Sequence, residues 1–82
     1  MFKYNISKHA SNSKFKSVCG KIEGAMKDFK HEEPIIDVDG SVIKIYSKEK
    51  LKIKIYNDYE VDAVYVDSDV DLTSVLKDEQ IS

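Results

Sequence analysis

The sequence predicts a small α+β domain in which one amphipathic helix packs on an antiparallel β-meander. Apolar residues recur at spacings of three and four only between about residues 13 and 30, as on one face of a helix. After Pro34 they alternate with polar residues in several short runs, which is typical of strands. The chain has 82 residues, 41% hydrophobic and 34% charged. This composition suits one soluble globular unit with a thin core, so we expect residues 1–82 to form a single domain.

The N-terminal half predicts one strand followed by the helix. Residues 2–6 alternate between apolar and polar side chains, which indicates a short strand with one buried face. Residues 11–13 are Ser-Asn-Ser, and such side chains cap helix N-termini. The apolar stripe of the helix then extends from Phe15 to Phe29. Pro34 excludes any longer helix, because the residue before proline avoids the helical region.

The second half predicts four strands, at residues 35–38, 43–45, 51–55 and 61–65. Asp39-Gly40 is a strong hairpin signal, and a two-residue loop there would place Ile36 opposite Ile43. Loops of three residues at 47–49 and 57–59 would align the apolar residues of the next strands on one face. The segment from Asp71 to Lys77 is compatible with a short terminal helix, which gives the order β-α-β-β-β-β with an optional last helix. The position of the first strand in the sheet cannot be predicted, although an edge is open to it.

This register assigns every strand residue to one of two faces. The face expected beneath the helix carries Ile43, Ile45, Leu51, Ile53, Ile55, Val61, Ala63 and Tyr65. The uncovered face is expected to carry Val42, Lys44, Tyr46, Lys52, Lys54, Tyr56, Asp62, Val64 and Val66. A mixture of tyrosine, valine and lysine is compatible with a partner or homodimer site, with an ordinary solvated sheet face, or with partial cover by the terminal segment.

The charges are segregated along the chain, and all thirteen cations are lysines. Residues 1–30 carry seven lysines against two acidic residues, whereas residues 57–82 carry eight acidic residues against one lysine. The net charge of -2 therefore combines a basic front half with an acidic end. Such a distribution steers association with a charged partner. The absence of arginine removes bidentate contacts to phosphate or guanine.

These observations favour binding over catalysis. Our leading hypothesis is a small non-enzymatic inhibitor that occludes a partner protein with a basic surface. An origin in a phage or mobile element fits the size and the lysine-rich coding bias, as for an anti-defence inhibitor such as an anti-CRISPR or a toxin immunity protein. The expected anchors are Tyr46, Tyr56, Val64 and Val66. The expected acidic contacts are Asp58, Glu60, Asp62, Asp67, Asp69 and Asp71.

The alternative hypothesis is a nucleic-acid-binding accessory protein. Lysines can hold phosphates while aromatic rings stack on bases, as in many single-strand binders. The residues available on the predicted uncovered face are Lys44, Lys52, Lys54, Tyr46 and Tyr56. The acidic end would repel a polyanion, so this partner is less favoured than a protein.

No motif predicts a catalytic, metal or cofactor site. The run from Asp67 to Asp71 resembles the start of a calcium loop, but Leu72 stands where the loop needs glycine. The two histidines lack a paired cysteine motif, which argues against zinc. Cys19 falls on the apolar stripe and is expected to be a core thiol. With no signal peptide and no apolar run long enough to span a bilayer, we expect a cytoplasmic protein that contacts no membrane.

Overall fold

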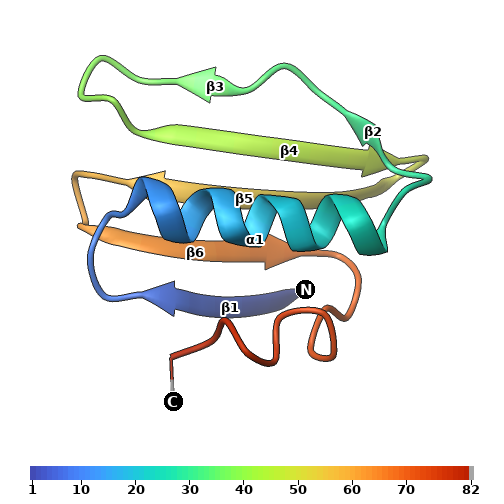
Figure 1. The fold of residues 1–82 in the computed structure, drawn as a ribbon. Helices are drawn as coiled ribbons and strands as arrows, with labels where there is room; N and C mark the ends of the chain where they lie inside the picture. Colours follow the sequence, from blue (N-terminus) through green and yellow to red (C-terminus); the bar gives the residue numbers. More distant parts are fainter. Residues whose placement is uncertain (82) are drawn as a thin grey trace.

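The structure is a computed structural model, and it describes residues 1–81. One helix lies on a six-stranded antiparallel sheet, which confirms the predicted α+β class (Figure 1). The elements in chain order are β1 (Phe2–Ser7), α1 (Asn12–Ala25), β2 (Lys30–His31), β3 (Ile35–Ile36), β4 (Val42–Lys48), β5 (Leu51–Asp58) and β6 (Ala63–Ser68). The strand order is β1-β6-β5-β4-β2, and β3 also pairs with β4. The first strand therefore occupies one edge of the sheet, beside the last strand.

Helix α1 begins where the sequence predicts and ends earlier than predicted. Ser11 is the N-cap, and its side chain accepts a hydrogen bond from the Lys14 amide. The helix ends at Ala25 because the chain must then turn to bury Phe29 and to pair Lys30 with Ser47 in β2. The predicted extension to residue 30 is wrong for this reason.

The hairpin loops differ from the prediction by one residue, and this difference inverts two strands. The β4–β5 turn has two residues, so that Tyr46 pairs with Ile53. The β5–β6 turn has four residues, so that Ile55 pairs with Val66. Both loops were expected to have three. Successive side chains of a strand point to opposite faces. A loop of two or four residues in place of three therefore moves the side chains of β4 and β6 to the opposite face of the sheet, while those of β5 stay on the predicted faces.

The predicted face assignment is therefore right for β5, from Leu51 to Tyr56, and wrong for β4 and for Ala63 to Val66 of β6. The side chains of Tyr46, Val64 and Val66 point toward α1 and are buried, with at most 1% of their surface exposed. Ile43 and Ile45 lie on the opposite face, since they pair with Tyr56 and Lys54 there. Leu51 and Val61, which were expected to be covered, are exposed.

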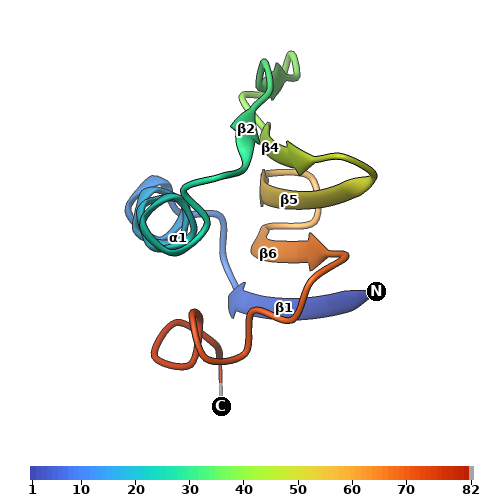
Figure 2. The same ribbon diagram turned by 90° about the vertical axis from the view of Figure 1, so that its right-hand side faces the viewer.

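The core lies between one face of the sheet, α1 and the C-terminal segment, residues 69–81. Figure 2 shows α1 and this segment on the same side of the sheet. The segment forms successive turns rather than the short helix that its sequence allowed, with isolated helical hydrogen bonds from the Leu76 amide to the Leu72 carbonyl oxygen (2.9 Å) and from the Gln80 amide to the Leu76 carbonyl oxygen (3.2 Å). Leu72 and Leu76 have no exposed surface. The segment also reaches β1, where the Ile81 amide donates to the Asn5 carbonyl oxygen (2.9 Å).

A buried carboxylate joins the C-terminal segment to the helix. Glu79 is 8% exposed, accepts a hydrogen bond from the Ser17 hydroxyl (2.5 Å) and lies 3.6 Å from the Lys21 ammonium. These contacts lower the pKa of Glu79, first through the Ser17 hydrogen bond. The segment is thus held by both apolar packing and charge.

Candidate protein-binding surface

Three of the four predicted anchors are unavailable to a partner, because Tyr46, Val64 and Val66 belong to the core. Tyr46 donates a hydrogen bond to the Glu23 carboxylate on α1 (2.5 Å) and meets the His31 ring edge-on at 4.9 Å. Burial, followed by the hydrogen bond to Glu23, raises the pKa of the Tyr46 hydroxyl. Burial also raises the pKa of the neighbouring Cys19 thiol, in keeping with the expected core role of that residue. Tyr46 thus ties β4 to α1.

The residues of the nucleic-acid alternative do not share one face. Lys44 and Tyr46 lie on the face that α1 covers, and the Lys44 ammonium is 5.8 Å from the Tyr46 ring centre. Lys52, Lys54 and Tyr56 lie on the opposite face. The lysine–tyrosine surface predicted for a polyanion is therefore divided between the two sides of the sheet.

The three residues left on the open face also have neighbours of their own. One face of the Tyr56 ring stacks on Tyr65, with ring centres 4.5 Å apart. Lys54 pairs with Asp67 across the strands, and the Lys52 ammonium lies 3.9 Å from Glu32. These contacts leave the open face balanced in charge rather than basic.

The predicted acidic surface is likewise divided, because the acidic residues lie at both ends of β6. Asp58, Glu60 and Asp62 precede the strand, whereas Asp69 and Asp71 follow it. A six-residue strand separates the two groups by roughly 20 Å. Asp67 lies between them, beside Lys54. A single partner contact over residues 58–71 would therefore have to span the whole sheet.

At the far end of β6, the carboxylates serve the fold. The Asp69 side chain accepts a hydrogen bond from the Lys52 amide (3.0 Å). The Asp71 side chain accepts from the Thr73 amide (2.9 Å) and from the Tyr4 hydroxyl (3.2 Å). Such bonds shape turns and hold the C-terminal segment in place. The acidic bias of this part of the sequence thus has a local structural cause.

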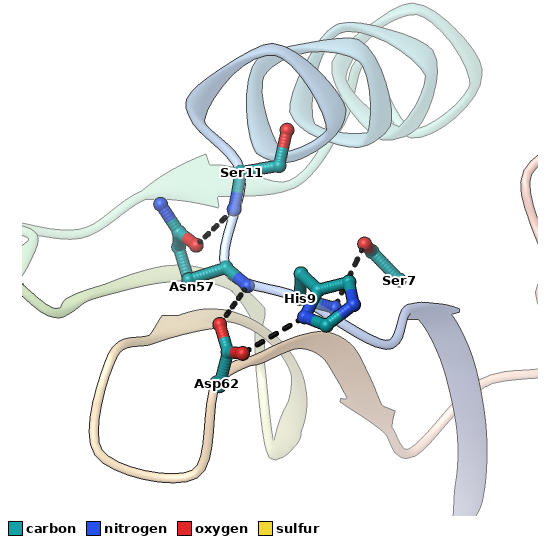
Figure 3. Close-up of polar contacts among 6 residues, drawn as sticks. Ser7, His9, Ser11, Asn57 and Asp62 are labelled. Carbon is teal, nitrogen blue, oxygen red and sulfur yellow. Dashed lines mark hydrogen bonds and ion pairs between the residues drawn. The ribbon is translucent and has the colours of Figure 1, made fainter.

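At the near end, Asp62 and Asn57 fasten the loop between β1 and α1 to the β5–β6 hairpin (Figure 3). The two carboxylate oxygens of Asp62 accept from the Ala10 amide and the His9 ring, each at 2.8 Å. Asn57 is fully buried, and its side-chain oxygen accepts from the Ser11 amide (3.0 Å). Asp62 has φ +56°, a conformation that aspartate tolerates better than most residues. The hairpin is therefore anchored to the start of the helix.

We expect the Asp62 contact to respond to pH in one direction. The His9 ring and then the Ala10 amide lower the pKa of Asp62. A lowered pKa in the folded state means that the contact stabilises fully above the ordinary aspartate pKa of about 3.9, and is lost as pH falls through the lowered value. In an NMR titration, the Ala10 amide shift should follow a midpoint below about 3.9. The variant Asp62→Asn should abolish this titration; an unchanged midpoint in the variant would contradict the contact.

The β3–β4 and β5–β6 turns are joined to one another at the same end of the molecule. The Tyr59 amide donates to the Ser41 hydroxyl (2.9 Å). The Tyr59 ring lies over Gly40, where an added Cβ would sit 3.7 Å from the ring. Gly40 has φ +89°, which side-chain-bearing residues rarely adopt. These contacts fix two turns that lie about twenty residues apart in the sequence as one unit.

A shallow pocket lies between the two joined turns, and carboxylates surround it. Ile43 and Tyr56 contribute apolar lining, and the acidic side chains are Asp37, Asp39, Asp58 and Glu60. Hydrogen bonds from Ser41 lower the pKa of Asp39, so this carboxylate is charged at neutral pH.

Exposed apolar side chains adjoin the pocket. Ile36 is 69% exposed, Val61 62% and Ile35 54%, and Val38 is fully exposed. We call this end of the molecule the turn-end surface, defined as Ile35, Ile36, Asp37, Val38, Asp39, Asp58, Tyr59, Glu60 and Val61. Apolar side chains clustered among charges are typical of interaction sites rather than of plain solvated surface.

Sequence reasoning found only part of this surface. Asp58 and Glu60 were among the predicted contacts, and both lie on it. Ile35, Ile36 and Val38 were assigned to a strand, and a half-buried strand would have hidden part of them. The predicted two-residue loop with Ile36 opposite Ile43 is wrong, because Ile43 pairs with Ile35 and the loop has three residues, which places Val38 in it.

Within residues 1–81 no group of three histidine, cysteine or carboxylate side chains is placed to hold a metal ion. In the same part of the chain, no helix has both the length and the apolar character needed to cross a membrane. No protein-family model, no curated protein and no solved structure matches this chain.

Proposed function

We propose that this protein is a small non-enzymatic inhibitor that binds a partner protein through the turn-end surface and occludes a basic region of it. The observation that carries the proposal is the joining of two turns, which holds four carboxylates around an apolar pocket beside exposed isoleucine and valine side chains. A lysine or arginine side chain of the partner would place its aliphatic part on Ile43 and Tyr56 and its charge among the carboxylates. The size and lysine-only basicity fit a protein encoded by a phage or mobile element, as an anti-defence inhibitor or a toxin immunity protein.

The test compares two variants that change the net charge equally at different places. Asp37→Lys with Glu60→Lys reverses two carboxylates of the turn-end surface, neither of which holds another element of the fold. Glu49→Lys with Asp78→Lys reverses two exposed carboxylates in the β4–β5 turn and the C-terminal segment. We expect the first pair to slow association with the partner about tenfold or more at low ionic strength, and the second to change it much less.

The partner is first captured from a nuclease-treated lysate of the source organism with the tagged protein. Association is then measured with the purified partner and both variants by surface plasmon resonance. Equal loss in both variants would indicate general charge attraction and would contradict a dedicated turn-end surface. Capture that disappears after nuclease treatment would favour the nucleic-acid alternative instead.

A further inference from the structure

Strand β3 has one side that no other strand of the described chain occupies. β3 pairs with β4 alone, with Ile35 opposite Ile43 and Ile36 opposite Val42. The Asp37 amide donates to the Ser41 carbonyl oxygen (2.8 Å), so the backbone N–H of Asp37 points toward β4. Because successive residues of a strand direct their backbone groups to opposite sides, Ile36 takes a non-hydrogen-bonded position relative to β4. The N–H and C=O groups of Ile36 therefore point away from β4, toward the open edge.

The side chains along this edge are apolar and exposed. Ile35 and Ile36 project to opposite faces of the sheet, and more than half of each side chain is accessible to solvent. Proteins ordinarily protect an exposed edge with proline, charge or a covering element. Pro34 and Asp37 flank the two isoleucines but do not cover them. An unpaired backbone next to uncovered apolar side chains is the arrangement that an added strand would complete.

The charges of the same segment decide which occupant fits. Residues 32–39 carry Glu32, Glu33, Asp37 and Asp39 and no cation. A second copy paired antiparallel about Ile36 would place Asp39 beside Glu33 of that copy, and a parallel pairing would place two Asp37 side chains together. Like charges in adjacent strands are destabilising. A segment in which lysine or arginine alternates with apolar residues meets the opposite situation, because its cations lie among four carboxylates.

We propose that β3 accepts an extended, lysine- or arginine-rich segment of the partner protein as an added strand. The Ile36 N–H and C=O bond the backbone of that segment, Ile35 and Ile36 contact its apolar side chains, and the carboxylates at both ends hold its cations. Pro34 and the turn at Val38 limit the backbone pairing to a short stretch, so the cations supply most of the selectivity. This inference rests on the proposed function and specifies how the turn-end surface would be used.

The test uses a substitution that removes the outward backbone donor together with the isoleucine side chain. Ile36→Pro eliminates the outward N–H without removing a β3–β4 hydrogen bond, and proline is tolerated at the edge of a sheet. Ile36→Val keeps the N–H and the side-chain character, and serves as the matched control. The probe is a short acetylated and amidated peptide in which lysine alternates with valine, and a glutamate–valine peptide of equal length is its counterpart. Retained amide spectra of β4 and β5 establish that each variant is folded.

Binding is measured by NMR, with hydrogen exchange of the Ile36 amide as the specific readout. We expect the lysine peptide to shift the amides of residues 35–39 and to slow exchange at Ile36. Ile36→Pro should weaken its binding about tenfold or more, whereas Ile36→Val should not. The glutamate peptide should not bind.

Two outcomes would overturn added-strand binding. The first is a failure of the peptide experiment. The lysine peptide does not bind, or it leaves the Ile36 amide unprotected, or it binds Ile36→Pro as tightly as the unaltered protein. The second is concentration-dependent protection of Ile36 without peptide, together with dimer formation in sedimentation, which would identify a second copy as the occupant. If the peptide experiment fails but the double variant Asp37→Lys with Glu60→Lys still weakens association with the partner protein, the proposed function stands. If the double variant has no effect either, both proposals fail.

Discussion

We expect Val66→Lys to unfold the protein or to leave it only marginally folded. Val66 has no exposed surface and packs in the core between the sheet and α1. A lysine there must either bury its ammonium without a partner or lose its proton, and each costs several kcal/mol. Domains of this kind are stable by about 5–15 kcal/mol in total, so a penalty of this size removes much of the folded population.

Neighbouring positions on β6 provide the control. Tyr65 lies on the opposite face of the sheet and is partly exposed, so Tyr65→Lys should cost far less than Val66→Lys. Thermal and urea unfolding followed by circular dichroism would measure both free energies of unfolding. If Tyr65→Lys unfolded the protein while Val66→Lys did not, the register of β5 and β6 described above would be refuted.

We expect Leu72→Ala and Leu76→Ala each to lower the free energy of unfolding by about 2–5 kcal/mol. Both side chains are fully buried although they belong to no regular helix or strand. Removing them leaves cavities beneath the C-terminal segment, next to Tyr4 and Ile6 of the same core cluster. The size of the effect reflects lost apolar contacts and the incomplete relaxation of the segment around the cavity.

Urea unfolding of both variants beside Ser74→Ala tests this expectation. Ser74 is exposed within the same turns, so its replacement should change stability by no more than about 0.5 kcal/mol. Losses below about 1 kcal/mol for both leucine variants would show that residues 69–81 are an appendage rather than part of the core.

The class of the fold could be predicted because it depends on periodicity alone. The spacing from Phe15 to Ala25 indicates an amphipathic helix, and the alternation after Pro34 indicates strands. The orientation of β4 and β6 depends instead on the parity of two hairpin loops. Aligning the apolar residues of neighbouring strands favoured loops of three residues. In the structure, however, Tyr46 rather than Ile45 points into the core beneath α1. Its ring fills space beneath α1 while its hydroxyl reaches Glu23, a contact that no pattern in the sequence signals.

The turn-end surface could be predicted only in part for a similar reason. Asp58 and Glu60 were visible as members of an acidic run, but the run also contained Asp62, Asp69 and Asp71. Those three bond to other segments of the fold, whereas Asp58 bonds only within its own hairpin, and composition cannot separate the two groups. The approach of the β3–β4 turn to the β5–β6 turn is a tertiary contact, which local periodicity does not encode.

The pairing of β1 with β6 has a consequence for how this chain folds. Residues 2–7 are made well before their partners at residues 63–68, and Ile81, which bonds to Asn5, is made later still. During synthesis β1 has no strand to pair with until β6 has been made, and until then α1 can pack only on an incomplete sheet. Pairings so distant in sequence close large loops, which slows folding relative to proteins whose contacts are local. The nascent protein therefore passes through a period in which its hydrophobic strand edges are open to chaperones and to aggregation.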